Sequence, residues 1–266
     1  MKIVVLDDAL DVANKAASYI AQTVEANPRA HIGLATGATQ NGVYRDLIER
    51  HRRGEISFGQ ASFFMLDEYV GVPVSSPTSF QQVLHSELLG QIDADDSALT
   101  ALDGNAQNLE QESARFEKAL KDSGGIDMQL LGIGTNGHIG FNEPGSPLDS
   151  RTREVVLEQA TRANNAPYFA SIEDVPRTAI TQGLGTIMEA QSILLVALGS
   201  AKSEAVKAMV RGPISEDCPA SILQLHPSVT VILDRAAAAL ISRERDATTP
   251  EMIDGNASEE EPAVAS

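Results

Sequence analysis

The chain has 266 residues, of which 42% are hydrophobic, and a formal net charge of −17. This length can bury a substantial core in one large domain or two small ones, and the hydrophobic share is ordinary for a globular protein. The negative charge argues against nucleic acid and anionic membrane surfaces as partners, because both would repel the chain.

Along the chain, short apolar runs alternate with amphipathic stretches. In chain order the pattern predicts strands at 3–6, 31–35, 62–66, 128–133, 192–198 and 229–233, and helices at 9–24, 42–52, 109–121 and 203–210, with another helix opening at Pro77. Asp7 or Asp8 is placed to cap the first helix. Strands that are apolar on both faces and alternate with helices predict an α/β fold, a single doubly wound, mainly parallel sheet with helices on both faces (Rossmann-like).

The C-terminal end differs in composition from the rest of the chain. Residues 250–266 carry five acidic residues, no Lys or Arg and no apolar periodicity. We therefore expect one domain over residues 1–245, and an acidic, disordered tail over 246–266.

The compartment is predicted from the cysteine content and the N-terminus. Cys218 is the single cysteine, so no disulfide can form within the chain, which favours the cytoplasm. The apolar stretch near the N-terminus is too short for a signal peptide. Two acidic residues precede Cys218 and should blunt its reactivity, so we expect it to be structural.

Ligands of a parallel α/β sheet bind outside the carboxyl ends of the strands, so functional residues should follow strands. A loop rich in small residues follows the strand at 31–35 and contains Thr36, Gly37, Ala38 and Thr39. Backbone amides at the start of the next helix can bind phosphate there. An ordinary turn is the competing interpretation.

Two charged residues follow other predicted strands. Asp67 comes directly after the strand at 62–66, where we expect a loop and a partly desolvated carboxylate able to act as a base. The alternative is that Asp67 or Glu68 caps the next turn. Lys202 lies at the start of a helix, an unfavourable place for a cation unless an anion is bound. It is therefore a candidate phosphate ligand, with a solvated lysine as the alternative.

The most specific loop follows the strand at 128–133 and reads Gly132-Ile-Gly-Thr-Asn-Gly-His-Ile-Gly-Phe-Asn-Glu-Pro-Gly145. Asn136, His138 and Glu143 can converge on one ligand there. Histidine titrates near neutral pH and can shuttle a proton, while a carboxylate orients it. Zinc is an alternative for a His–Glu pair, but no second histidine lies at ligand spacing and no cysteine is nearby, so we expect no metal.

This loop and Asp67-Glu-Tyr-Val-Gly71 together resemble the glucosamine-6-phosphate deaminase family. The likeness continues through 150–153, 198–202 and 215–221 and reaches about residue 240. It implies conversion of glucosamine 6-phosphate and water to fructose 6-phosphate and ammonia, in amino-sugar catabolism, without a metal or organic cofactor.

The resemblance also implies a role for each candidate residue. His138 would assist opening of the pyranose ring, and Asn136 and Glu143 would orient and polarise its imidazole. Asp67 would remove the C2 proton. The loop from Thr36 to Thr39 and Lys202 would hold the phosphate of the sugar.

The chain departs from the family pattern at the phosphate end. Gln40 stands where members usually have Pro, and a phosphate-binding arginine of the family falls on Pro167. Losing such a charged donor costs about 1.5–3 kcal/mol of binding. Arg162 and Arg177 are the candidates to replace it.

Two further departures concern the shuttle and regulation. Asn136 stands where many members have Asp, so it can orient His138 but cannot add charge. Val155 stands where some members have a lysine that feeds an allosteric site, so we expect activation by amino-sugar phosphates to be weak or absent.

Three alternatives stay open beside the deaminase. A 6-phosphogluconolactonase-like hydrolase shares the fold and a glycine-rich His motif, but Phe141-Asn-Glu-Pro144 favours the deaminase. A non-catalytic sugar-phosphate sensor is motivated by Pro167 and Asn136 and opposed by the intact Asp67, His138 and Glu143. Galactosamine 6-phosphate is an alternative substrate. The family includes monomers and hexamers, so the sequence leaves homo-oligomerisation open.

Overall fold

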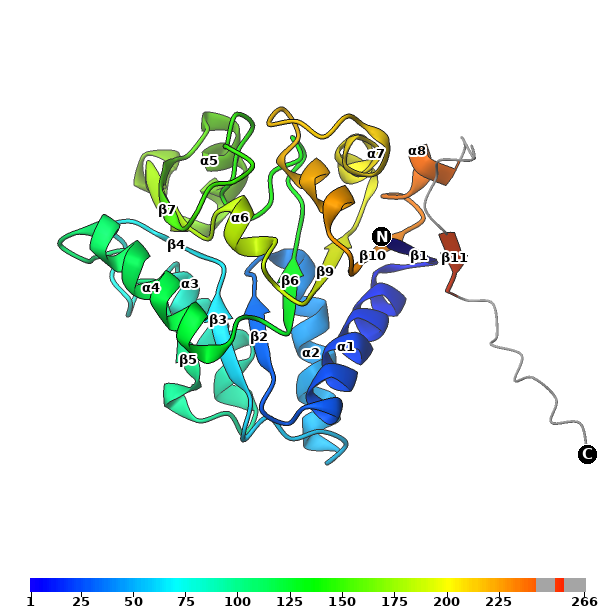
Figure 1. Cartoon of the computed structure of the whole chain (residues 1–266), viewed down its shortest axis with the longest axis horizontal. Coiled ribbons are helices and arrows are strands. Elements are labelled where there is room, and N and C mark those ends of the chain that lie inside the picture. The colour runs from blue at the N-terminus through cyan, green and yellow to red at the C-terminus, as the bar shows by residue number, and fades with distance from the viewer. Residues whose placement is uncertain (243–251, 256–266) are drawn as a thin grey trace, which may run out of the picture.

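The computed structural model describes residues 1–242 and 252–255, and its main feature is an eight-stranded sheet (Figure 1). The strand order is β11-β1-β10-β9-β6-β2-β3-β5, and every neighbouring pair is parallel. The strands are β1 (Lys2–Leu6), β2 (His31–Leu34), β3 (Ser62–Met65), β5 (Leu99–Thr100), β6 (Met128–Leu131), β9 (Ser192–Ala197), β10 (Val229–Asp234) and β11 (Met252–Asp254). The predicted fold class is confirmed.

Helices cover both faces of this sheet. They are α1 (Ala9–Ala26), α2 (Ala38–Arg52), α3 (Phe80–Glu87), α4 (Leu109–Ser123), α5 (Gln159–Asn165), α6 (Leu184–Ile187), α7 (Ser203–Arg211) and α8 (Ala239–Ser242). Short 3-10 turns are η1 (Leu89–Gln91), η2 (Asp96–Ala98), η3 (Ala166–Tyr168), η4 (Ile172–Asp174), η5 (Ser200–Lys202) and η6 (Pro219–Leu225). Asp8 caps α1 as predicted, because its carboxylate accepts from the amides of Leu10 and Asp11. α2 begins four residues earlier than predicted, so half of the small-residue loop is helical.

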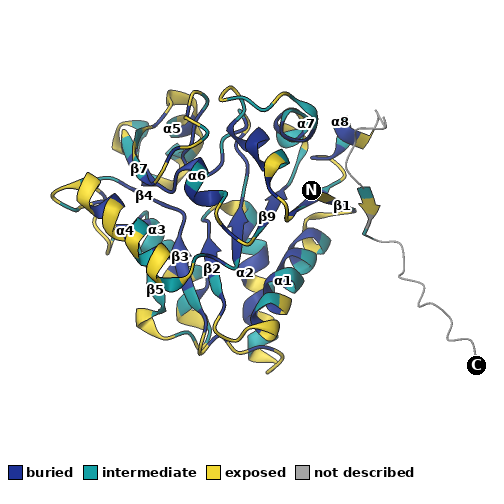
Figure 2. Cartoon of the chain, viewed as in Figure 1, coloured by how far each residue is buried: buried dark blue, intermediate teal, exposed yellow. Residues whose placement is uncertain are grey.

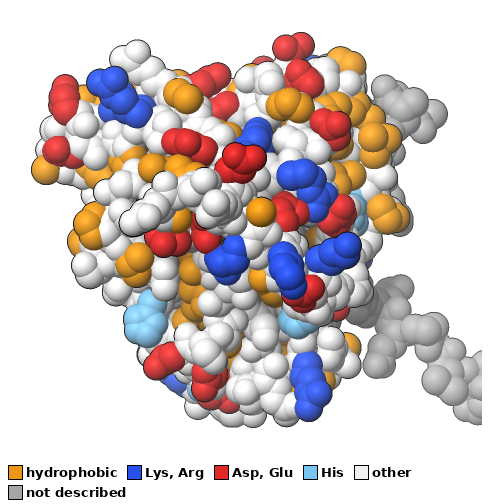
Figure 3. All heavy atoms as spheres, turned by 60° about the vertical axis from the view of Figure 1, so that its left-hand side comes forward, with side chains coloured by type: hydrophobic (Ala, Val, Ile, Leu, Met, Phe, Trp, Pro, Cys, Tyr) orange, Lys and Arg blue, Asp and Glu red, His pale blue; other side chains and the backbone are white. Residues whose placement is uncertain are grey.

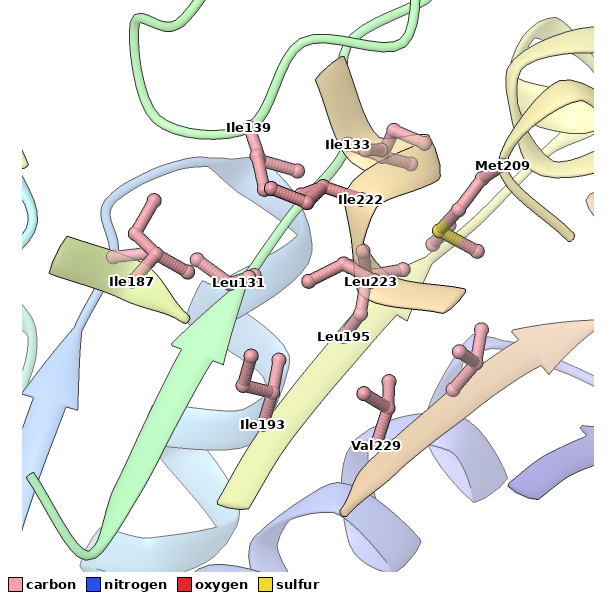
Figure 4. Packing of buried hydrophobic residues seen from close by; sticks show 14 of the residues in the cluster. Leu131, Ile133, Ile139, Ile187, Ile193, Leu195, Met209, Ile222, Leu223 and Val229 are labelled. Carbon is pink, nitrogen blue, oxygen red and sulfur yellow. The ribbon is translucent and has the colours of Figure 1, made fainter. Parts of the chain in front are cut away.

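The central strands of the large sheet are buried (Figure 2), and their alternating side chains belong to two separate cores. Ile193 and Leu195 of β9 belong to the core that includes residues of α4, α6, α7 and η6. Figure 4 shows both side chains in this core, together with Leu131, Ile222 and Leu223. Their neighbours in β9, Leu194 and Val196, join α1, α2 and α3 on the opposite face. This period of two, with both faces buried, is what a sheet covered by helices on two sides requires.

A second, smaller sheet was not predicted. It is antiparallel, with the order β4 (Asp67–Tyr69), β8 (Thr178–Thr181), β7 (Arg153–Val156). The expectation of a loop at Asp67 is therefore wrong, because Asp67 pairs with Thr181 in β4. A three-residue strand whose partner lies more than a hundred residues away leaves no local signal.

The C-terminal end contains one ordered element within the expected tail. β11 pairs in parallel with β1 through Ile3–Val5 and extends the sheet by one strand. The edge of β1 offers unpaired backbone groups that a short extended segment can satisfy, whatever its composition. The other residues of the expected tail lie outside the described part of the chain, so the proposed domain boundary stays a prediction.

Candidate active site

The candidate site lies where the chain changes direction across the sheet. β2 and β6 are neighbours in the sheet. From β2 the chain continues to β3, toward one edge of the sheet, and from β6 it continues to β9, toward the other edge. Loops diverge at such a switch point and leave a crevice at the carboxyl ends of the strands. A cavity of about 490 Å³ occupies this position and is lined by the segments that follow β2, β3, β6 and β9. All four predicted loops therefore meet there.

The first predicted loop forms one wall of the cavity. Thr36, Gly37, Ala38 and Thr39 all line it. Gly37 is the N-cap of α2, has a φ of 135°, and provides no side-chain cap. By contrast, side chains cap α1, α3 and α4. The first amides of a helix have no intrahelical partner, so those of α2 remain available to an anion in the cavity.

Lys202 is the N-cap of α7 and also lines the cavity. Burial lowers the pKa of its ammonium group. Among the described lining residues it is the only Lys or Arg. A half-buried cation beside an uncapped helix start is stabilised by a bound anion, as the sequence predicts.

Neither candidate for the missing arginine reaches this site. The Arg162 guanidinium donates to the carbonyls of Ile172, Val175 and Pro176, so it ties α5 to the following turn. Arg162 and Arg177 are both absent from the residues described as lining the cavity. The expectation that one of them replaces the arginine at Pro167 is therefore not supported by the geometry.

The third loop brings Asn136, His138 and Glu143 together, as predicted. His138 Nδ1 lies 2.7 Å from Asn136 Oδ1 and 3.2 Å from Glu143 Oε2. Asn136 Nδ2 donates to Glu143 Oε2 over 2.9 Å and to Glu158 Oε2 over 3.3 Å. Only His138 of this trio lines the cavity, so the other two act through it.

These contacts determine which nitrogen of His138 carries the proton. The side-chain nitrogen of Asn136 must face the carboxylates of Glu143 and Glu158, because only the nitrogen can donate a hydrogen bond to each of them. Asn136 Oδ1 therefore faces His138, and both groups near Nδ1 are acceptors. Nδ1 must then be protonated, which leaves Nε2 of neutral His138 as a proton acceptor.

Glu143 is held as a carboxylate. Burial disfavours its ionised form, but hydrogen bonds from His138 and Asn136 and the charge of His138 outweigh that effect and lower the pKa of Glu143 to about 2. The negative charge stabilises a proton taken up by His138, so the pair is suited to a reversible shuttle.

Two glycines of the third loop allow this packing. A Cβ at Gly134 would lie 2.2 Å from the His138 ring, so only glycine fits beneath the imidazole. Gly137 has a φ of 85°, and a Cβ there would meet Cys218 Sγ at 2.6 Å. Burial raises the pKa of the Cys218 thiol. Cys218 thus supports the loop from behind, in agreement with the predicted structural role.

Asp67 also lines the cavity, at the start of β4. Its side chain is buried, with 7% of the residue exposed, and no described residue donates a hydrogen bond to its carboxylate. Burial and then the charge of Glu68 raise the pKa of Asp67 to about 8. A desolvated carboxylate without donors is a stronger base than an ordinary aspartate, which agrees with the predicted role.

Glu68, which the sequence offers only as a possible cap of the next turn, has a supporting role that the sequence does not predict. Its buried carboxylate accepts from the amides of Phe80 and Gln81 and from the Ser79 hydroxyl at the start of α3. It also accepts from the amide of Tyr69. Glu68 therefore ties β4 to α3 and fixes the backbone that presents Asp67. Its partners at the start of α3 lie eleven or more residues away, beyond the reach of a local capping pattern.

An apolar wall also escaped the sequence analysis. The rings of Phe80 and Phe141 stack with centroids 5.8 Å apart, and Tyr69 contacts both. Phe169, from the turn after α5, meets Tyr69 edge-on. All four rings line the cavity and give part of its wall an apolar surface from which a substrate can readily displace water.

Comparison with known proteins gives a family. A family model described as glucosamine-6-phosphate isomerases/6-phosphogluconolactonase matches residues 7–232. The chain belongs to this family. It is 48% identical to a glucosamine-6-phosphate deaminase of Corynebacterium aurimucosum, with 91% of this chain and 94% of the relative covered, and 46% identical to one of Rhodococcus opacus, with 90% and 92% covered.

Solved structures of the family agree. A monomeric glucosamine-6-phosphate deaminase superposes with a TM-score of 0.89 at 44% identity, over 90% of this chain and all of that one. A 6-phosphogluconolactonase from Trypanosoma brucei gives a TM-score of 0.69 at 22% identity, over 90% and 98% of the two chains, and shows a shared fold only.

The described residues contain neither a cluster of metal ligands nor a membrane-spanning helix. No three His, Cys, Asp or Glu side chains are grouped so that they could hold a metal ion. No helix in residues 1–242 is long and apolar enough to cross a bilayer.

Proposed function

We propose that this protein is a glucosamine-6-phosphate deaminase, which converts glucosamine 6-phosphate and water to fructose 6-phosphate and ammonia. The observation that carries the proposal is one cavity that holds a desolvated base, Asp67, and a histidine with a free acceptor nitrogen, His138. The names of the relatives at 44–48% identity support the same activity.

The substrate phosphate would bind at the end of the cavity that holds the start of α2. Thr36, Gly37, Ala38 and Thr39 offer hydroxyl and backbone donors, and Lys202 supplies the positive charge. A local cluster of this kind overcomes the repulsion between a phosphate and a chain of net charge −17.

Ring opening would be assisted by His138. Its Nε2 accepts the proton of the C1 hydroxyl and returns a proton to the ring oxygen, which breaks the bond between C1 and that oxygen. Asn136 holds the required tautomer, and the Glu143 carboxylate stabilises the protonated imidazole.

Deamination requires a proton to move from C2 to C1, because the product carries its carbonyl at C2. Asp67 would take the C2 proton, giving an enolamine, and return it to C1, which leaves an imine at C2. Water then adds at C2 and ammonia departs, so the overall change is hydrolytic. The apolar wall of Tyr69, Phe80 and Phe141 keeps bulk water from the base until then.

The relatives' names also favour the gluco substrate over galactosamine 6-phosphate. We infer that the protein works in the cytoplasm, where its single cysteine stays reduced, in amino-sugar catabolism. A monomer is favoured because the similar solved deaminase is described as monomeric.

The direct test is to incubate the purified protein with glucosamine 6-phosphate and to measure ammonia and fructose 6-phosphate. We expect turnover by the wild type, and a loss of at least a thousandfold in kcat for Asp67→Asn with substrate affinity largely kept. Absence of turnover at millimolar substrate would overturn the proposal. Hydrolysis of 6-phosphogluconolactone instead would favour the lactonase, and phosphate-ester binding without chemistry would favour a sensor.

A further inference from the structure

Gln40 is a cavity residue without a role in the chemistry described above. It is the third residue of α2 and lines the cavity, and only 2% of it is exposed. Its Nε2 atom has no hydrogen-bond partner among the described residues. A buried amide donor without a partner is costly, and such groups are uncommon unless a ligand satisfies them.

The position of the carboxamide is made possible by two glycines. A Cβ at Gly132 would lie 2.9 Å from Gln40 Nε2, and a Cβ at Gly37 would lie 3.0 Å from Gln40 Oε1. The amide therefore sits between the loop that follows β2 and the loop that follows β6. This is the point at which the crevice of the sheet opens.

The kind of ligand follows from the electrostatics of that place. The third position of a helix commonly holds Glu, which compensates the partial positive charge of the helix start. Here the residue is the neutral Gln40, and Gly37 provides no side-chain cap, so the start of α2 keeps its attraction for an anion. Lys202 is the only cation among the described lining residues, so a tetrahedral oxyanion there needs further neutral donors.

We propose that the side-chain amide of Gln40 donates a hydrogen bond to a phosphate oxygen of the substrate. The inference rests on the proposed function only for the identity of the sugar, because the phosphate site itself can be tested with inorganic phosphate.

The test uses Gln40→Met, which keeps the shape of the side chain and removes the donor, and Gln40→Glu, which adds a carboxylate. Titration calorimetry with inorganic phosphate and with fructose 6-phosphate should show a Kd about tenfold higher for Gln40→Met and higher still for Gln40→Glu. With substrate, KM should rise while kcat changes little, because the contact is the same in the ground state and the transition state.

Matched controls come from Gln111, the exposed third residue of α4, which lies outside the cavity. Gln111→Met and Gln111→Glu should leave both Kd values unchanged. In the absence of phosphate, Gln40→Met should melt at the wild-type temperature or above it, since it removes an unpaired buried donor. Gln40→Ala serves as a second donor-free variant.

Three results would overturn the inference. The first is a wild-type protein that does not bind phosphate. The second is a Kd for phosphate of Gln40→Met and Gln40→Ala within twofold of the wild-type value. The third is a lower melting temperature of these variants with an unchanged Kd, which would indicate a structural role. Failure of the wild type to deaminate glucosamine 6-phosphate would instead contradict the proposed function and leave the phosphate titrations interpretable.

Discussion

At the scale of single residues, the site separates two acidic groups by their surroundings. Glu143 is surrounded by donors, which outweigh the effect of burial and lower its pKa to about 2. Asp67 is buried without donors, and its pKa is raised to about 8. A carboxylate is thus kept charged at Glu143, beside the histidine, and made basic at Asp67.

The raised pKa of Asp67 predicts how stability depends on pH. Asp67 keeps its proton up to about pH 8 in the folded protein, whereas an aspartate of the unfolded chain loses its proton near pH 4. Between these two values, the free energy of unfolding therefore decreases as the pH rises. Asp67→Asn removes the cost, and its gain in unfolding free energy should grow from pH 5 to pH 9. Urea titrations of both proteins at these pH values measure the difference.

Asp95→Asn is the control, because hydrogen bonds from Ser97 lower the pKa of that exposed carboxyl group. Its difference from the wild type should not grow between pH 5 and pH 9. A constant difference for Asp67→Asn over the same range would contradict the raised pKa. In the wild type, the same ionisation should place the acidic limb of kcat/KM near pH 8.

At the scale of elements, the third loop is linked to α5. Asn136 joins Glu143 of its own loop to Glu158, the N-cap of α5, by two hydrogen bonds from one amide group. Thr161, Asn164 and Asn165 of α5 line the cavity. The residue at position 136 must therefore donate to two carboxylates, which an aspartate cannot do.

This link predicts a compensating pair of substitutions. Asn136→Asp should lower kcat/KM by roughly tenfold, since three carboxylates would then meet, and Glu158→Gln in the same chain should restore roughly fivefold. Glu158→Gln alone should stay within twofold of the wild type, as should the exposed control Glu154→Gln. Equal rates for Asn136→Asp with and without Glu158→Gln would show that the two residues are not coupled.

At the scale of the whole molecule, both signs of charge are mixed over the face shown in Figure 3, and this face carries no basic patch that would attract a phosphate. Within the cavity, Lys202 supplies a positive charge. The position that could supply a regulatory cation holds Val155, whose side chain packs against the small core around Tyr69 and Phe141. Arg153, two residues before Val155, donates hydrogen bonds to the side chains of Asn142 and Ser146.

We therefore expect hyperbolic velocity curves. Velocity against glucosamine 6-phosphate should give a Hill coefficient near 1, and N-acetylglucosamine 6-phosphate should not activate the enzyme. Sedimentation under assay conditions should show a monomer. Sigmoidal curves that become hyperbolic with N-acetylglucosamine 6-phosphate would contradict this prediction.

The parallel sheet and seven of the residues that line the cavity could be predicted from the sequence alone. Apolar periodicity specifies each strand locally, and the rule that ligands bind at the carboxyl ends brings Thr36, His138 and Lys202 to one edge. Only the tertiary structure decided the strand at Asp67, the support from Glu68 and the unpaired amide of Gln40. Each of these depends on groups far apart in the chain, and burial and hydrogen bonding between such groups leave no periodic pattern.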